Sequence, residues 1–290
     1  MQQAIDKAAA LVEAHAYIRQ FTGAVVVVKI GGSIMDDPET LESLVQDVCF
    51  MASVGIKPVL VHGGGKAINA AMAQAGLEAQ FVQGRRYTDE RTLAIAEHVL
   101  VNQINRGLVE TIGTLGHAGM GLHSLASCVV FGKRLKLPGE GGRQIDIGLV
   151  GQVEQVNAPL IQALLKTATI PVIAPIARDP AGGKLNINAD SVAGHVAAAL
   201  NAEKLVLVSD THGIRRSENV DDLASSLTRE EIDDLTERGI ITAGMLPKVE
   251  ASLTAVAGGV RKAHIIDGRI PHSLLLEVYT DQGVGTEIVL

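Results

Sequence analysis

The feature that most restricts the fold is a run of four valines, a lysine and an isoleucine at residues 25–30, which ends in Gly31-Gly32. Such a run is typical of a parallel strand buried on both faces. The pattern returns at residues 58–62, which lead into three glycines at 63–65. A helix is predicted after each glycine cluster, and the first runs from Asp37-Pro38 to Gly55. Strand, glycines and helix in alternation indicate an open α/β sheet.

The rest of the chain continues this alternation with one interruption. Periodicity and capping signals predict further helices at residues 2–20, 89–113 and 157–168, after Asp190, after the Thr228–Glu231 capping box, and at 244–258. Further strands are predicted at residues 172–174, 205–208, 263–266 and 286–289. Residues 127–156 lose the helical period and alternate with glycines, which indicates hairpins.

These elements predict a three-layer αβα sandwich around a mainly parallel open sheet, in two lobes. The glycine-rich turn at residues 178–183 is the candidate lobe boundary. It separates residues 24–180 from residues 181–290, and a helix within residues 1–23 precedes both lobes. That first helix either caps the sheet or offers its apolar stripe of Ala8, Leu11, His15 and Ile18 to another subunit.

Composition excludes several classes of function. The net charge is −7, and the longest basic cluster, residues 133–136, is short and reads as a solvated loop, so no nucleic-acid partner is expected. No apolar run reaches the roughly 18 residues needed to cross a membrane, and no signal peptide is recognised, so a cytoplasmic protein is expected. Cys49 and Cys128 lie in apolar surroundings without metal-ligand spacing and read as reduced core residues.

Both glycine clusters lie where ligands bind to open α/β sheets, beyond the carboxyl ends of strands. Glycines there let the backbone approach an anion closely, although tight turns would explain either cluster alone. Neither cluster fits a Walker A loop or a G-x-G-x-x-G fingerprint. Lys29 is the most informative side chain, because an ammonium inside a buried strand needs an anionic partner unless it extends to solvent. Its position before Gly31-Gly32 favours a phosphate.

Polar residues in the second half add to this pattern. Asn186 and Asn188 would share one face of an extended segment that leads into a helix. Asp190 would lie at or near the start of that helix, where a role as its N-cap would explain it. Lys248 follows Gly244 in the first turn of another helix, a place where a surface lysine is also common.

Six motifs in this order resemble the amino acid kinase superfamily, most closely its acetylglutamate kinases of arginine biosynthesis. They are Val28-Lys-Ile-Gly-Gly-Ser33, His62-Gly-Gly-Gly65, Gly84-Arg-Arg-Tyr-Thr88, Asn186-Ile-Asn-Ala-Asp190, Ser209-Asp210 and Gly244-Met-Leu-Pro-Lys248. The resemblance covers residues 20–290. It implies an acetylglutamate-binding and dimerisation lobe followed by an ATP-binding lobe.

The resemblance also implies a reaction, the ATP-dependent phosphorylation of the γ-carboxylate of N-acetyl-L-glutamate. In that reaction Lys29 and Lys248 would stabilise the transferring phosphoryl group, and Asp190 would orient both lysines. The acceptor would be bound by Gly64, Gly65, Arg86 and Asn186, with Arg86 on its α-carboxylate, and the nucleotide by Gly31, Gly32, Ser209, Asp210 and Gly244. Mg²⁺ would arrive on the ATP phosphates without a protein metal site. A carboxylate of pKa about 4.3 is already ionised, so no general base is expected.

The N-terminal helix and the C-terminal stretch resemble the arginine-inhibited, hexameric subgroup of these kinases. The resemblance implies an allosteric arginine site made by Tyr17, His272, Glu277 and Gly283, although a plain helix–loop–strand ending also fits the last three. It further implies a homo-oligomer, either dimer or hexamer, and a PII-type regulatory protein as a partner.

Two other readings stay open at this point. One is a sister kinase for acetylaminoadipate or another carboxylate, and the other is a silent arginine sensor, against which the retention of Lys29 and Lys248 argues. Carbamate and uridylate kinases fit residues 84–88 and 186–190 less well. Lys66 and residues 122–142 depart from the family pattern, which leaves the detail of the acceptor open.

Overall fold

The computed structural model describes residues 1–123, 127–219, 222–242, 244–279 and 283–290, with the side chains of Lys7, Ala10 and Leu11 outside that description. The helices are α1 (Gln2–Phe21), α2 (Pro38–Ser53), α3 (Gly65–Gln74), α4 (Glu90–Glu97), α5 (Arg106–Thr114), α6 (Ala158–Lys166), α7 (Ala189–Ala199), α8 (Arg229–Glu237), α9 (Leu246–Ala257) and α10 (Ser273–Tyr279). Two short 3₁₀ turns, η1 (Ile34–Asp36) and η3 (Glu140–Gly142), and a π-helical segment, η2 (His98–Asn105), complete the helical elements.

The strands are β1 (Val25–Ile30), β2 (Lys57–His62), β3 (Phe81–Val82), β4 (Arg85–Arg86), β5 (Ala118–Leu122), β6 (Val130–Pro138), β7 (Gln144–Val156), β8 (Thr169–Ile173), β9 (Ile176–Arg178), β10 (Lys184–Asn186), β11 (Lys204–Ser209), β12 (Ser226–Leu227), β13 (Lys262–Asp267) and β14 (Gly285–Ile288). Eight of them form one sheet in the order β12-β14-β13-β11-β1-β2-β8-β5. All neighbours in it are parallel except β13 and β14.

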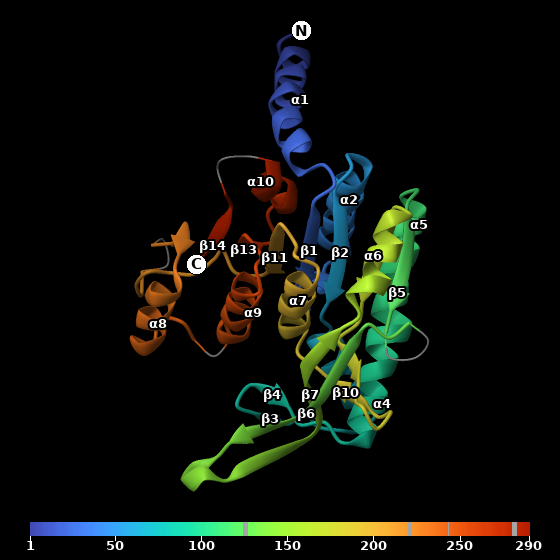
Figure 1. Cartoon of the computed structure of the whole chain (residues 1–290), viewed down its shortest axis with the longest axis vertical. Coiled ribbons are helices and arrows are strands. Elements are labelled where there is room, and N and C mark those ends of the chain that lie inside the picture. Colours follow the sequence, from blue (N-terminus) through green and yellow to red (C-terminus); the bar gives the residue numbers. More distant parts are fainter. Residues whose placement is uncertain (124–126, 220–221, 243, 280–282) are drawn as a thin grey trace.

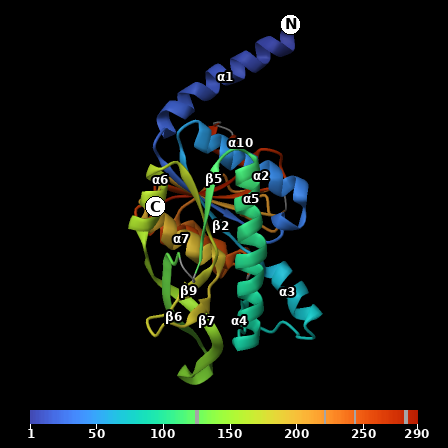
Figure 2. The same ribbon diagram turned by 90° about the vertical axis from the view of Figure 1, so that its right-hand side faces the viewer.

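Alternate residues of the central strands feed two separate hydrophobic cores, one on each face of the sheet. Val27 packs in the core that includes residues of α6, α7, α8 and α9, whereas Val26 and Val28 pack with residues of α2, α5 and α10. Figure 2 shows the same division, with α6 and α7 on one side of the sheet and α2 and α5 on the other. The predicted αβα sandwich around a mainly parallel sheet is therefore confirmed.

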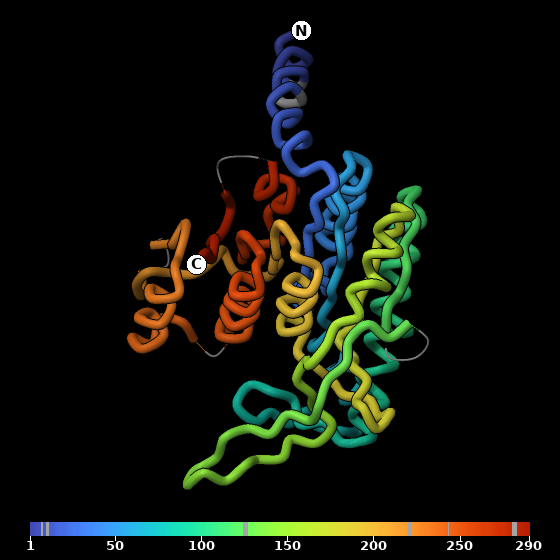
Figure 3. Tube along the Cα trace, viewed as in Figure 1, coloured from blue at the N-terminus to red at the C-terminus, as the bar shows by residue number. Residues whose placement is uncertain are grey.

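The stretch of hairpins predicted at residues 127–156 is confirmed by the long antiparallel pair β6–β7, which extends away from the main sheet (Figure 3). The reading of residues 133–136 as a loop is wrong, because they lie inside β6. Their basic side chains are solvated all the same, and Lys133 Nζ lies 2.8 Å from Glu154 Oε1 on the paired strand. These charges therefore lie on a solvated strand face.

The proposed lobe boundary at residues 178–183 forms the turn between the antiparallel strands β9 and β10. Its Gly183 N–H donates to Asp179 Oδ1 at 2.9 Å. In space, the first and second halves of the chain meet in the main sheet, where β1 pairs with β2 on one side and with β11 on the other. The division into lobes at residue 180 stays a prediction.

Helix α1 confirms the predicted N-terminal helix and stands apart from the rest of the molecule (Figure 1). Tyr17 and Ile18, near its end, pack on the core beside α2 and α10. Farther out, Ile5 and Val12 are 53% and 75% exposed. Of the expected stripe, Leu11 lies outside the described side chains.

The two cysteines are free, and their environments differ. Cys49 is buried in the core, as expected, whereas Cys128 is half-buried and its thiol donates to Val130 O. Among the described residues, no helix is long and apolar enough to cross a bilayer.

Candidate active site

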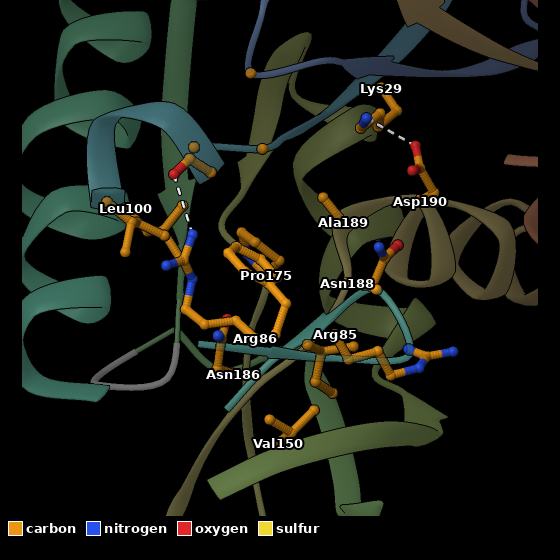
Figure 4. A pocket seen from close by; sticks show the side chains of 18 residues that line it. Lys29, Arg85, Arg86, Leu100, Val150, Pro175, Asn186, Asn188, Ala189 and Asp190 are labelled. Atoms are coloured by element: carbon orange, nitrogen blue, oxygen red, sulfur yellow. Dashed lines mark hydrogen bonds and ion pairs between the residues drawn. The ribbon is translucent and has the colours of Figure 1, made fainter. Parts of the chain in front are cut away.

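Lys29 lies near the carboxyl end of β1, between β2 and β11, and its side chain is only 6% exposed. Its Nζ is 2.7 Å from Asp190 Oδ1 (Figure 4). A buried ammonium is tolerated when a carboxylate neutralises it, so this contact accounts for a lysine within the valine run. The anionic partner expected from the sequence is therefore found within the protein itself.

Asp190 is brought to Lys29 by the first turn of α7. The N-cap of this helix is Asn188, whose side chain accepts the Ser191 N–H at 3.1 Å, so the reading of Asp190 as N-cap is wrong. The carboxylate of Asp190 is thereby left to face the lysines. Lys248, in the first turn of α9, places its Nζ 3.9 Å from Asp190 Oδ2.

The charges around this carboxylate shift the pKa values of Asp190 and Lys248. Burial acts to raise the pKa of Asp190, but the charges of Lys29 and Lys248 hold it below its usual value. Burial lowers the pKa of Lys248, the charge of Asp190 opposes this, and the charge of Lys29 adds to it. Two partly desolvated cations that share one carboxylate leave net positive charge at the end of β1, where an anion would be stabilised.

The two glycine clusters pack against each other. A Cβ added to Gly32 would lie 3.3 Å from Gly65 N, and one added to Gly63 would lie 3.3 Å from Gly32 N. Gly31 donates its N–H to Val208 O at 2.9 Å and does not line the cavity described below, whereas Gly32 does. Of the two glycines expected to hold phosphate, Gly32 is thus the one placed to present its backbone.

A cavity of about 240 Å³ lies between these glycines, the β3–β4 hairpin and the start of α7. Figure 4 shows side chains from several elements directed toward it. It brings together Lys29, Asp190, Gly64, Gly65, Arg86 and Asn186, together with residues the sequence did not single out: Ile68, Phe81, Arg85, Leu100, Val150, Pro175 and Ile187. Asn188 also lines it, as expected if both asparagines share one face.

Arg86 is the cation on the far side of this cavity from Lys29. Its Nη2 donates to Gly65 O at 3.1 Å, and its guanidinium lies 4.9 Å from the centre of the Phe81 ring. Burial lowers the pKa of Arg86. In the described part of the chain no carboxylate forms an ion pair with it, so a bound anion would supply the missing partner.

Asn186 is tied to Arg86 through a side chain that sequence reasoning missed. Its Nδ2 donates to Thr88 Oγ1 at 3.3 Å, and that hydroxyl donates to Arg86 O at 2.9 Å. Thr88 is fully buried. The only sequence signal for it was its place in the Gly84–Thr88 motif.

A second cavity of about 490 Å³ opens at the carboxyl ends of β11 and β13. Asp210, Met245 and Arg269 line it, whereas Ser209 is buried beside Asp210 and Gly244 precedes Met245 without lining the space. Asp267 Oδ2 lies 2.7 Å from Arg269 Nη2 and 2.9 Å from His212 Nδ1, an arrangement that the sequence did not indicate. Lys66, the departure from the family pattern, is exposed and lies 2.7 Å from Asp36.

The four residues expected to bind arginine have different surroundings. Glu277 Oε1 lies 2.6 Å from His264 Nδ1, and its Oε2 accepts the Val284 N–H at 2.9 Å, next to Gly283. His272 instead places Nδ1 2.6 Å from Asp47 Oδ1, on a separate cavity beside α2. Tyr17 packs on the core. The structure thus joins Glu277 with Gly283 and gives His272 another partner.

Comparison with known proteins identifies the family. The family model described as the amino acid kinase family matches residues 24–267. Acetylglutamate kinases of Methanothrix thermoacetophila and Symbiobacterium thermophilum are 46% and 44% identical to this chain over 98% and 99% of it, and over 99% of each relative. That of Synechococcus elongatus is 45% identical over 99% of this chain and 93% of its own.

Solved structures agree with this result. N-acetylglutamate synthase from Neisseria gonorrhoeae, complexed with coenzyme A and N-acetyl-glutamate, has a TM-score of 0.86 and 25% identity over 98% of this chain. The chain spans 63% of that synthase's length. Carbamate kinase of Giardia, at a TM-score of 0.64 and 17% identity over 92% of this chain and 99% of its own, shares the fold. The protein therefore belongs to the amino acid kinase family, among its acetylglutamate kinases.

Proposed function

We propose that this chain transfers the γ-phosphoryl group of ATP to the γ-carboxylate of N-acetyl-L-glutamate. The observation that carries the proposal is the pair Lys29 and Lys248, held on Asp190 at one end of a cavity that has Arg86 at the other. The names of relatives at 43–46% identity support the same reaction.

The chemistry fits the residues present. The acceptor carboxylate is already a nucleophile at neutral pH, so the barrier comes from its repulsion by the phosphate oxygens. Lys29 and Lys248 offset that repulsion and stabilise the charge of the transferring group. The carboxylate of Asp190 faces both ammonium groups, so it orients the lysines. It has no role as a base, because the ionised acceptor carries no proton to remove.

Arg86 would bind the α-carboxylate of the acceptor with its planar guanidinium. Asn186 would hold the acetylated amine side, and the backbone of Gly64 and Gly65 would bound the acceptor close to Lys29. An acceptor laid between Arg86 and Lys29 would direct its side-chain carboxylate toward the lysines. The length of the acceptor is therefore the property that this cavity would select.

ATP would occupy the cavity at the ends of β11 and β13, with its phosphates directed past Gly32 toward Lys29 and Lys248. Asp210 and the first turn of α9, after Gly244, would bound the nucleotide, and the buried Ser209 would support Asp210. Among the described residues no group of three His, Cys, Asp or Glu side chains is placed to hold a metal. In the proposed reaction Mg²⁺ would be held by the ATP phosphates and water, and would neutralise part of their charge.

One assay tests the reaction and separates its alternatives. The protein is incubated with MgATP and one acid at a time, and any acyl phosphate is trapped as the hydroxamate. The highest yield is expected with N-acetylglutamate. A higher yield with N-acetylaminoadipate would favour the sister kinase, and no product with any acid would reject the kinase and leave the silent arginine sensor.

We also propose that arginine inhibits the enzyme at a site near Glu277 and Gly283, with Tyr17 of α1 and His272 bordering it. The exposed apolar side chains of α1 support a contact of this helix with a second copy of the chain, which would give a hexamer rather than a dimer. A PII-type regulator is part of the same expectation, as is a cytoplasmic location.

Inhibition by free arginine and its loss on Glu277→Gln would support this site. Light scattering should show a smaller assembly for Val12→Asp. Arginine inhibition that persists unchanged without residues 1–20 would argue against a role for α1.

A further inference from the structure

One buried polar side chain beside the cavity has no part in the proposed reaction. His62 is the last residue of β2 and is fully buried. Its Nδ1 lies 3.0 Å from Gly63 O, and its Nε2 lies 3.1 Å from Asn105 Nδ2. Both ring nitrogens therefore face a polar partner.

These partners determine which nitrogen carries the proton. A carbonyl oxygen only accepts, so Nδ1 of His62 carries the hydrogen and donates it to Gly63 O. Nε2 then accepts from the amide of Asn105, whose Nδ2 also donates to Val172 O at 2.9 Å. Burial lowers the pKa of His62 to about 4, so the ring is neutral near pH 7. The network is complete without any charge.

Asn105 comes from an irregular part of the long helix. It ends η2, the π-helical segment between α4 and α5, and π-helical turns are rare and are often found at functional sites. A Cβ added to Gly121 would lie 2.3 Å from Asn105 Oδ1, so the neighbouring strand also leaves room for this side chain. The π-helical segment η2 and Gly121 of β5 thus together allow the Asn105 amide to reach His62.

The same π-helical segment also touches the glycine loop directly. A Cβ added to Gly64 would lie 2.7 Å from Leu100 Cδ2 and 2.8 Å from Ile104 Cδ1. The glycine loop is therefore held in two ways, by the hydrogen bond from His62, which Asn105 supports, and by the packing of Leu100 and Ile104. Gly63, Gly64 and Gly65 line the cavity.

We infer that His62 and Asn105 are positioning residues that hold Gly63–Gly65 in the conformation that binds the acceptor. The inference rests on the proposed function, because it concerns how the acceptor is held during phosphoryl transfer. Neither side chain lines the cavity. Their effect on an acceptor would pass through the backbone of the loop, whereas the second cavity is lined by other elements and should be unaffected.

The test compares His62→Asn with His62→Phe in steady-state kinetics of the full chain. Asparagine can still donate to Gly63 O but is too short to reach Asn105, and phenylalanine loses both hydrogen bonds. The KM for the acceptor should rise about tenfold or more, with the larger rise for phenylalanine, because small misplacements of a bound reactant are costly. The KM for ATP should stay the same.

Two further variants separate positioning from stability. Ile161→Ala opens a cavity in the buried face of α6 and should lower Tm without raising the acceptor KM. The double variant His62→Phe, Asn105→Leu removes donor and acceptor together, so Tm should recover relative to His62→Phe while the acceptor KM stays raised.

The outcomes are distinct. An acceptor KM that is unchanged in both His62 variants, or that recovers together with Tm in the double variant, would overturn the inference. If the wild-type chain forms no hydroxamate with any acid, the proposed function fails instead.

Discussion

Strands β1 and β2 lie side by side and both run into glycines, but they bury different polar side chains beside them. Lys29 of β1 is a cation whose nearest partner is the carboxylate of Asp190, within reach of the cavity. His62 of β2 is neutral, is satisfied by Gly63 and Asn105, and does not line the cavity. A buried charge keeps the capacity to attract a ligand, whereas a completed neutral network can only hold its neighbours. The end of β1 therefore acts on a ligand through charge, and we call it the electrostatic side of the site. The end of β2 acts through the shape of the backbone, and we call it the steric side.

The largest expected effect comes from removing charge on the β1 side. Lys29→Ala should lower kcat by about 10²–10³-fold, the usual cost of losing one group that stabilises transition-state charge, with little change in either KM. Lys166→Ala, an exposed lysine in the last turn of α6, is the matched control and should be neutral. A raised KM at unchanged kcat would show that Lys29 binds substrate equally well in the ground and transition states.

Asp190→Asn keeps the shape of the side chain but leaves both lysines without their counter-ion. The charge of Asp190 raises the pKa of Lys248, so its removal should lower that pKa further. The protonated form of Lys248 would then be lost at lower pH, and the alkaline limb of the kcat profile should move to lower pH. At neutral pH kcat should fall by about tenfold to a hundredfold.

Asp233→Asn, on the exposed face of α8, is the control for Asp190→Asn and should leave the profile unchanged. An alkaline limb that stays in place in Asp190→Asn would separate Lys248 from the active charge cluster. Such a result would weaken the contrast between the two strand ends, because Lys29 alone would then define the electrostatic side.

On the β2 side the expected effects are steric and smaller. Gly64→Ala would force a Cβ against Leu100 and Ile104, which should lower the free energy of unfolding by about 1–3 kcal/mol. The acceptor kcat/KM should fall about tenfold, since the loop must shift. In Gly107→Ala of α5 the new Cβ meets nothing within 4 Å, so this control should gain about 0.5–1 kcal/mol. Equal behaviour of the two variants would contradict a tightly packed loop.

The sequence predicted the parts of this contrast that local patterns encode. The central strands were predictable because each valine-rich run is followed directly by its glycine cluster. Lys29 lies within the first of these runs, so the electrostatic side could be located from the sequence as well. The contact of His62 with Asn105 spans 43 residues, and a π-helical turn has no apolar period of its own, so the steric side stayed hidden. Residues 133–136 were misread because their strand belongs to a solvated hairpin, where charges are not excluded.

Asp190 shows why the sequence alone leaves the local geometry of a helix start open. A carboxylate near a helix start is a good N-cap, and so is an asparagine, so propensity alone could not choose between Asn188 and Asp190. The structure gives the cap to Asn188, two residues earlier. The choice of cap residue decides whether the carboxylate of Asp190 points at backbone N–H groups or at the lysines.

The smallest expected effect tests that detail. Asn188→Ala removes the cap of α7 and should cost about 1 kcal/mol of unfolding free energy, while kcat falls less than in Asp190→Asn because the carboxylate remains. Thr228→Ala removes the cap of α8, whose residues line neither cavity, and should cost a similar amount with kcat unchanged. Urea unfolding and kcat measured on both variants give the comparison directly. If the two lose stability equally and only Asn188→Ala loses turnover, the start of α7 positions the charge centre as well as stabilising the fold. If neither variant loses turnover, the ion pairs with Lys29 and Lys248 are enough to hold the carboxylate of Asp190 in place. The cap of α7 would then stabilise the fold without positioning the charges.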